Sequence, residues 1–224
     1  MSIAENFEKI RHKIRRAEKE AGRAPESCNL VAVSKMQSAG TIRAALDTGH
    51  RLFGENRVQE AQEHWKSYRD DKAYHDLQLH LIGPLQTNKV DDALALFDCI
   101  ETIDREKLAK AIANALTPQS RTGEFFVQVN TGQEEQKAGI DPLHAVEFVR
   151  FCRNDCGLNI TGLMCIPPVE DAAALHFALL KKLAGQAGLQ KLSMGMSSDF
   201  EKAIMLGATH VRVGTALFGE RDAA

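Results

Sequence analysis

The sequence predicts a single (β/α)8 barrel of the TIM type, preceded by an extra N-terminal helix. Short apolar runs alternate with helix-type segments along the 224 residues, and eight such pairs can be counted. Eight strand–helix units in one undivided chain favour a closed barrel. No Pro- or Ser-rich linker interrupts the chain, so we expect residues 1–224 to form one domain. An open doubly wound sheet is the alternative, but it would more often contain fewer strands.

The first predicted element is an amphipathic helix that Gly22 ends. Its apolar residues recur at three- and four-residue steps, namely Ile3, Phe7, Ile10, Ile14, Ala17 and Ala21. The first predicted strand, 30–35, is an apolar run without polar alternation, as in buried parallel sheets. The eight predicted strands are 30–35, 52–54, 77–82, 97–103, 125–130, 159–166, 191–195 and 209–214. The predicted helices that follow them are 39–47, 59–67, 88–95, 105–116, 142–153, 169–184, 199–206 and the short piece 216–218.

Composition excludes several classes of function. Hydrophobic residues make up 44% and charged residues 26%, which is ordinary for a soluble globular protein. Lys and Arg number 28 against 30 Asp and Glu, so no basic surplus favours nucleic acid or anionic lipid. The N-terminal segment lacks the apolar core of a signal peptide, and no run is long enough for a membrane span. We therefore expect a cytoplasmic protein without nucleic-acid or membrane partners.

The five cysteines support this location. Their number is odd and most lie in apolar contexts, as expected for buried free thiols in a reducing compartment: Cys28, Cys99, Cys152, Cys156 and Cys165. Cys152 and Cys156 are four residues apart on a predicted helix, but no Cys or His pair completes a zinc site.

A lysine ends the first predicted strand. Residues 30–35 read L-V-A-V-S-K, so Lys35 lies at the carboxyl end of an apolar strand, where barrels place their chemistry. Lysine can form a Schiff base once desolvation lowers the pKa of its amine. The alternative is that Lys35 marks a strand that leaves the core, with its ammonium reaching water.

The loops after the seventh and eighth strands predict a phosphate site. Ser197 and Ser198 offer hydroxyls and amides where a helix begins, which attracts an anion. Gly214 permits close approach of the backbone and Thr215 adds a further hydroxyl. The alternative is a simple capping box formed by Ser198 and Glu201.

A strand-end lysine opposite a phosphate cup suggests pyridoxal phosphate, whose aldehyde takes the lysine while its phosphate is held at the far end. Arg212 ends the eighth strand and could face the pyridine nitrogen, where its fixed charge would disfavour a protonated ring. The alternative for Arg212 is a surface ion pair, which fits poorly with a strand that is otherwise apolar.

Seven segments carry a resemblance to a known family: V-A-V-S-K (31–35), F-G-E-N-R-V-Q-E (53–60), H-L-I-G-P-L-Q-T-N-K (80–89), V-N-T-G-Q-E-E-Q-K-A-G (129–139), G-L-M-C-I-P-P (162–168), L-S-M-G-M-S-S-D-F (192–200) and V-R-V-G-T-A-L-F-G (211–219). Together they resemble the pyridoxal-phosphate homeostasis protein family (YggS/PROSC), over essentially the whole chain. That family is similar in fold to the barrel domain of alanine racemase.

The resemblance implies roles for individual residues. It makes Lys35 the Schiff-base lysine that carries pyridoxal phosphate and Arg212 the neighbour of the ring nitrogen. It makes Ser197, Ser198, Gly214 and Thr215 the phosphate cup. It also places Asn56 and Met194 beside the cofactor.

Three further residues are left open by the resemblance. Lys137 falls where related barrels carry a basic residue near the phenolic oxygen of the cofactor. His80 is expected either in the barrel mouth or as a packed or surface histidine. Arg57 stands where the family often has an aromatic residue or lysine after G-E-N, so no stacking role is assigned to it.

The resemblance implies a holder and supplier of pyridoxal phosphate in vitamin B6 and amino-acid homeostasis, without established catalysis. Pyridoxal-phosphate-dependent apoenzymes are then the expected partners. Racemisation needs two bases, and the extra domain of alanine racemase that supplies the second is expected to be absent here. A weak racemase or related enzyme is the second interpretation. The third is a Schiff-base aldolase without a cofactor.

Overall fold

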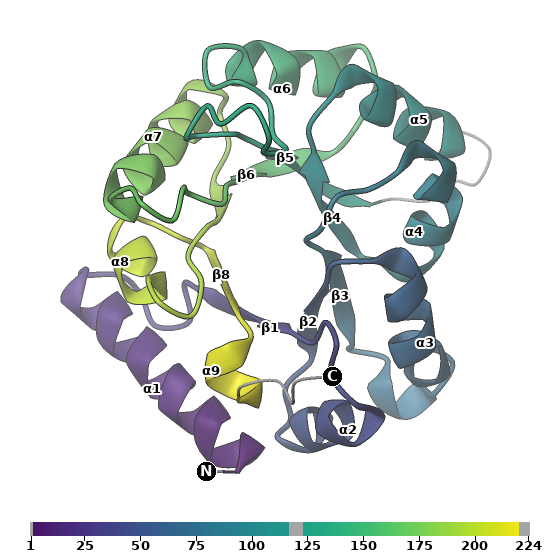
Figure 1. The fold of residues 1–224 in the computed structure, drawn as a ribbon, viewed down its shortest axis with the longest axis vertical. Coiled ribbons are helices and arrows are strands. Elements are labelled where there is room, and N and C mark those ends of the chain that lie inside the picture. The colour runs from purple at the N-terminus through teal and green to yellow at the C-terminus, as the bar shows by residue number, and fades with distance from the viewer. Residues whose placement is uncertain (1, 117–122, 220–224) are drawn as a thin grey trace.

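The computed structural model describes residues 2–116 and 123–219 and shows a closed barrel of eight parallel strands in chain order (Figure 1). The strands are β1 (Asn29–Val33), β2 (Leu52–Glu55), β3 (Gln78–Leu81), β4 (Cys99–Ile103), β5 (Glu124–Gln128), β6 (Ile160–Met164), β7 (Lys191–Ser193) and β8 (His210–Val213). β1 pairs with β8, with Val31 opposite Arg212, which closes the sheet. The predicted barrel is therefore confirmed, and the open sheet is excluded.

Helices surround the barrel on the outside (Figure 1). They are α1 (Ile3–Glu20), α2 (Ala39–Asp47), α3 (Val58–Arg69), α4 (Val90–Leu96), α5 (Glu106–Leu116), α6 (Ala145–Asn154), α7 (Ala173–Gln186), α8 (Phe200–Met205) and α9 (Thr215–Phe218), with the short 3-10 turns η1 (Lys72–Tyr74) and η2 (Thr87–Lys89). α7 begins later than the predicted residue 169. Val169 is 92% exposed, so it does not belong to the apolar face that anchors the helix.

The N-terminal helix is held by its own cap and by the end of the chain. Ser2 and Glu5 form a capping box, in which each side chain accepts from the other residue's backbone N–H. The apolar face of α1 packs against α8 and α9 (Figure 1). Asn6 Nδ2 also donates to the carbonyl oxygen of Leu217 at 2.8 Å. α1 thus supports the segment that follows β8.

The strands separate two different cores. Between strands and helices lies one large apolar cluster, which includes Phe53 and Trp65. The barrel interior holds a small apolar cluster of Cys99, Phe126 and Met164. Side chains alternate along each strand, and the interior also receives buried polar groups, namely His80, Glu101, Ser193, His210 and Arg212. The interior is therefore partly ionic.

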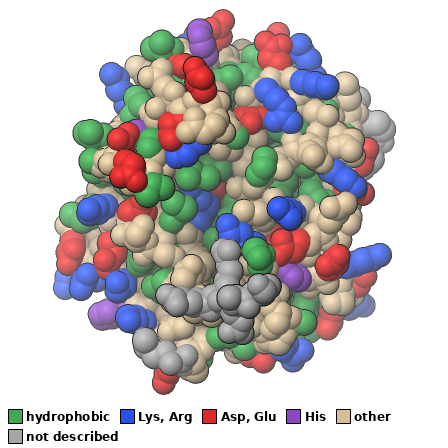
Figure 2. All heavy atoms as spheres, viewed as in Figure 1, with side chains coloured by type: hydrophobic (Ala, Val, Ile, Leu, Met, Phe, Trp, Pro, Cys, Tyr) green, Lys and Arg blue, Asp and Glu red, His purple; other side chains and the backbone are tan. Residues whose placement is uncertain are grey.

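The surface carries charges of both signs. Lys and Arg side chains are interspersed with Asp and Glu over the face that Figure 2 shows. Among the described helices, none combines the length and apolarity that a membrane crossing requires. The five thiols are unpaired, and four of them are buried.

Candidate functional site

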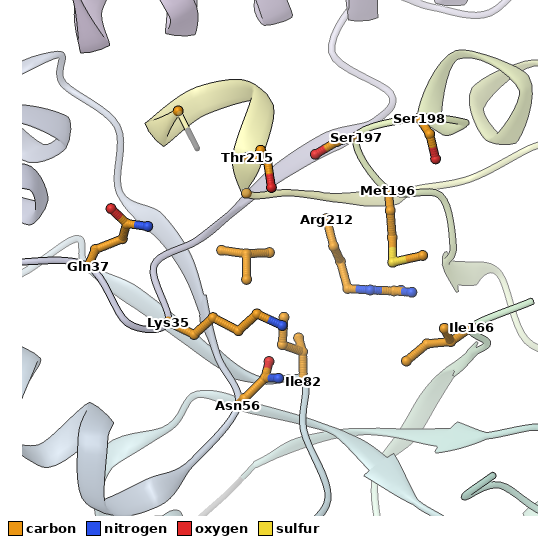
Figure 3. Close-up of a pocket in the computed structure, with 13 residues that line it drawn as sticks. Lys35, Gln37, Asn56, Ile82, Ile166, Met196, Ser197, Ser198, Arg212 and Thr215 are labelled. Carbon is orange, nitrogen blue, oxygen red and sulfur yellow. The ribbon is translucent and has the colours of Figure 1, made fainter. Parts of the chain in front are cut away.

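A cavity of about 320 Å³ opens at the carboxyl ends of the strands, within the size range of small-molecule sites. Residues from both ends of the chain line it because β1 and β8 are neighbours. The lining residues are Val33, Lys35, Gln37, Asn56, Ile82, Ile166, Met196, Ser197, Ser198, Arg212, Gly214, Thr215 and Gly219. In Figure 3, Lys35 and Asn56 enter from one side and Ser197 and Thr215 from the other, with Arg212 between them.

The lysine is positioned through the residues on either side of it. Ser34 donates its hydroxyl to Glu55 Oε1 at 2.7 Å, and the backbone N–H of Met36 donates to the carboxylate of Glu60. Met36 adopts a left-handed conformation with φ of 60°, which is uncommon for a residue with a side chain. Lys35 itself is half-buried and lines the cavity, so its side chain does not simply run to solvent.

Asn56 follows β2, and its backbone lies close to Gly83 in the loop after β3. A Cβ atom on Gly83 would lie 2.2 Å from the carbonyl oxygen of Asn56. A side chain at position 83 would therefore displace this wall of the cavity.

The opposite wall consists of the two predicted phosphate loops. Within residues 2–116 and 123–219, the hydroxyls of Ser197, Ser198 and Thr215 form no hydrogen bond to the protein. α8 starts at Phe200 with Asp199 as its N-cap and no side-chain cap. The alternative capping box of Ser198 and Glu201 is therefore not formed.

The seventh loop turns sharply at Gly195. This glycine has φ of +93°, and a Cβ atom there would lie 2.5 Å from Ala203 Cβ. Its carbonyl oxygen accepts from the backbone N–H of Arg212 at 2.9 Å. Gly195 thus brings the serine loop against β8.

Arg212 is 4% exposed and lies inside the barrel, so the alternative of a surface ion pair is wrong. Its Nη1 donates to Ser193 Oγ at 2.7 Å, and its Nη2 donates to the carbonyl oxygen of Cys165 at 2.7 Å. The guanidinium is fixed at both ends while it lines the cavity.

The structure brings together seven of the eight residues that the sequence predicted for the cofactor. Met194 is the exception, because it is fully buried in the helix-facing apolar cluster and does not line the cavity. Strand alternation explains this: Ser193 faces the barrel interior, so Met194 faces the helices. Met196 lines the cavity instead, together with Gln37, Ile82 and Ile166, which the sequence reasoning missed. A two-residue step from Lys35 would have indicated Gln37, whereas Met194 is excluded only once the inward direction of Ser193 is known.

The three residues left open have separate environments. Lys137 Nζ pairs with Glu134 Oε2 at 2.5 Å, outside the cavity lining. His80 lies inside the barrel, where its Nδ1 is 2.7 Å from Glu101 Oε1, so it is a packed histidine. Arg57 is exposed at the start of α3.

Fold and site together define a class: (β/α)8 barrels that present a lysine, a buried arginine and a group of hydroxyls to one small cavity. The family model of the alanine racemase N-terminal domain matches residues 6–222. The chain is 38% identical to the pyridoxal phosphate homeostasis protein of Vibrio cholerae, over 99% of this chain and 97% of that protein. The chain therefore belongs to the pyridoxal phosphate homeostasis protein family.

Solved structures agree with this assignment. The structure of PipY from Synechococcus elongatus with pyridoxal phosphate (PLP) bound is similar, at a TM-score of 0.81 and 36% identity, over 97% of this chain and all of that chain. An alanine racemase of Clostridium difficile shares the fold, at a TM-score of 0.71 and 14% identity, and this chain covers 57% of it.

Proposed function

We propose that this protein binds PLP in the cavity and holds and supplies it for vitamin B6 and amino-acid homeostasis. One observation carries the proposal: a lysine amine, a buried guanidinium and three unengaged hydroxyls meet in one cavity of about 320 Å³. The PLP-bound PipY relative supports the identity of the ligand.

The donor set fits this cofactor. No carboxylate is among the described residues that line the cavity, while one lysine and one arginine are, so the site favours an anionic ligand. Ser197, Ser198 and Thr215 would hold the phosphate, with Gly214 in close approach. Val33, Ile82, Ile166 and Met196 offer apolar contact for the ring.

Lys35 would hold the cofactor covalently as a Schiff base. Its neutral amine would attack the aldehyde carbon, a C=N bond would replace the C=O bond, and the oxygen would leave as water. Asn56 lies next to the amine in Figure 3, where its side-chain amide can orient the polar edge of the ligand.

Arg212 would face the ring nitrogen and keep it unprotonated, because the guanidinium stays charged at all relevant pH values. Bound PLP supplies an electron sink for reactions at the α-carbon of amino acids, and an arginine partner weakens that sink. Among the described lining residues none is a His, Tyr, Cys, Asp or Glu that could act as a second proton carrier. This supports a holder of the cofactor over an enzyme, with PLP-requiring apoenzymes as recipients. The unpaired thiols support action in the reducing cytoplasm.

A weak amino-acid racemase is the second candidate, because the matching family model is that of the alanine racemase N-terminal domain. Loss of deuterium from the α-carbon of labelled amino acids, abolished in Lys35→Ala, would establish it.

The test of the proposed function is an absorbance spectrum of the protein after PLP is added, before and after borohydride. We expect a visible band that borohydride removes, with the label mapped to the peptide that contains Lys35. Lys35→Ala should show no such band, while the control Lys89→Ala, at a lysine outside this cavity, should match wild type. A colourless protein from which borohydride traps a sugar phosphate would instead indicate the aldolase.

A further inference from the structure

A buried chain of polar groups runs from the cavity into the barrel. Arg212 Nη1 donates to Ser193 Oγ at 2.7 Å, and Ser193 Oγ lies 2.5 Å from Glu101 Oε2. The other oxygen of Glu101 lies 2.7 Å from His80 Nδ1. Ser193 and Glu101 are fully buried, and neither lines the cavity. The chain thus links the cavity wall on β8 to a carboxylate on β4.

The chemistry of these groups fixes the direction of each bond. An arginine can only donate, and Ser193 has one hydroxyl hydrogen. Because Ser193 accepts from Arg212, its own hydrogen points to Glu101. An ionised carboxylate only accepts, so His80 donates to it through Nδ1. Glu101 therefore accepts two hydrogen bonds, one from Ser193, which itself accepts from Arg212, and one from His80.

The electrostatics agree with an ionised Glu101. Burial opposes its charge, but the hydrogen bond from His80 and the charges of His80 and Arg212 outweigh burial, so the pKa of Glu101 is about 2. Burial lowers the pKa of the neighbouring His210 to about 4, so that imidazole is neutral near pH 7. Arg212 and Glu101 are then opposite charges bridged by one hydroxyl in a site of low dielectric.

We propose that Glu101 is a positioning residue for the cofactor: through Ser193 it fixes the orientation of Arg212 and balances its charge at the ring end of the cavity. This inference rests on the proposed function. A buried cation without a counter-charge is costly, and a guanidinium held on two sides keeps its remaining N–H groups directed at the ligand. Glu101 does not line the cavity, so it acts through Arg212.

The test compares the PLP adduct of wild type with those of Glu101→Gln, Glu101→Asp and Ser193→Ala. Glu101→Gln removes a negative charge near the barrel mouth, which disfavours an added proton there. We expect the pH midpoint of the visible band to fall by about one unit. Glu101→Asp keeps the charge and should restore the midpoint. A residue that served folding alone would not give this pattern.

The link through Ser193 is tested by the rate at which PLP is lost on dilution. Glu101→Gln and Ser193→Ala should each speed this loss about tenfold, and the double variant should be no worse than either, because both break the same chain. Ser193→Ala keeps the charges of both Arg212 and Glu101. It therefore tests the link even if Glu101→Gln does not fold.

Glu124→Gln is the matched control. Glu124 is also a strand carboxylate of this barrel, but it pairs with Lys191 and is not linked to Arg212. A midpoint in Glu101→Gln equal to that of wild type, an equal shift in Glu124→Gln, or additive losses in the double variant would overturn the inference. A wild-type protein that forms no band with PLP would overturn the proposed function instead.

Discussion

The two ends of the cavity are held in place by different means. At the lysine end, side-chain carboxylates from the neighbouring unit fix the backbone: Glu55 binds Ser34, and Glu60 binds the N–H of Met36. At the hydroxyl end, the loops are fixed by backbone bonds and close packing around Gly195, and the hydroxyls of Ser197 and Thr215 make no bond to the described protein.

The difference follows from what each end must do. A lysine on a four-carbon stem has many rotamers, so its backbone must be fixed firmly if the amine is to point into the cavity. Hydroxyls that receive an anion must instead keep their donors free. Loss of a carboxylate should therefore damage the fold and the lysine together, whereas loss of a hydroxyl should affect retention of the ligand alone.

The largest effect on stability is expected from a substitution of Glu55, which is fully buried. Its Oε1 accepts from Ser34, from His64 Nδ1 at 3.0 Å and from Trp65 Nε1 at 2.9 Å. Glu55→Gln removes the charge from the acceptor of these three bonds and buries an NH2 group where Oε2 has no partner, so it should lower the free energy of unfolding by about 2–4 kcal/mol. Urea denaturation measures this, with Glu63→Gln, at an exposed position on α3, as control. Equal stability of the two variants would contradict the comparison.

The second-largest effect on stability is expected from a substitution of Gly195. Gly195→Ala places a side chain at positive φ and against Ala203. It should therefore lower the free energy of unfolding by about 1–3 kcal/mol and speed the loss of PLP. Gly185→Ala is the control, because its Cβ would meet nothing within 4 Å on helix α7. That change should stabilise by about 0.5–1 kcal/mol. Normal stability and retention in Gly195→Ala would show that the loop does not depend on this turn.

A purely local effect is expected at the hydroxyls. Ser197→Ala and Thr215→Ala should each speed the loss of PLP roughly tenfold, since a hydrogen bond to a charged group contributes about 1.5–3 kcal/mol. Their melting temperatures without PLP should match wild type, as should that of the exposed control Ser67→Ala. Unchanged retention in both variants would remove these hydroxyls from the phosphate site.

The smallest effect is a dependence on pH confined to the lysine end. The hydrogen bond to Glu55 raises the pKa of His64. The stability from this pair is therefore fully present below the unfolded pKa of about 6.5 and is lost as the pH rises through the folded pKa. We expect a loss of less than about 1 kcal/mol, because the imidazole of His64 is itself only partly buried and is screened by solvent. Denaturation of wild type and His64→Gln across this range measures it, and parallel curves would contradict it.

The fold was predictable because short apolar runs alternate with helix-type segments eight times along one undivided chain. The site was largely predictable for a related reason: Lys35 and Thr215 follow strands, so their position in the chain already places them at the mouth. It was harder to predict which face of a strand a given residue lies on. Met194 and Ser193 differ by one position, and the apolar run alone does not show which of the two faces the barrel axis.

The supporting carboxylates were not predictable from the chain. Glu55 and Glu101 lie within short apolar strands, where their partners come from other elements. Glu101 meets Ser193 92 positions along the chain, and that contact exists only once the barrel has closed. Local patterns carry no information about such a pairing.

The pairing of β1 with β8 has a consequence for biosynthesis. Lys35 leaves the ribosome well before Arg212 and Thr215, because both come far later in the chain. A nascent chain that still lacks its final strand displays the amine without its partners. The complete cavity can therefore form only after β8 has been made and has paired with β1.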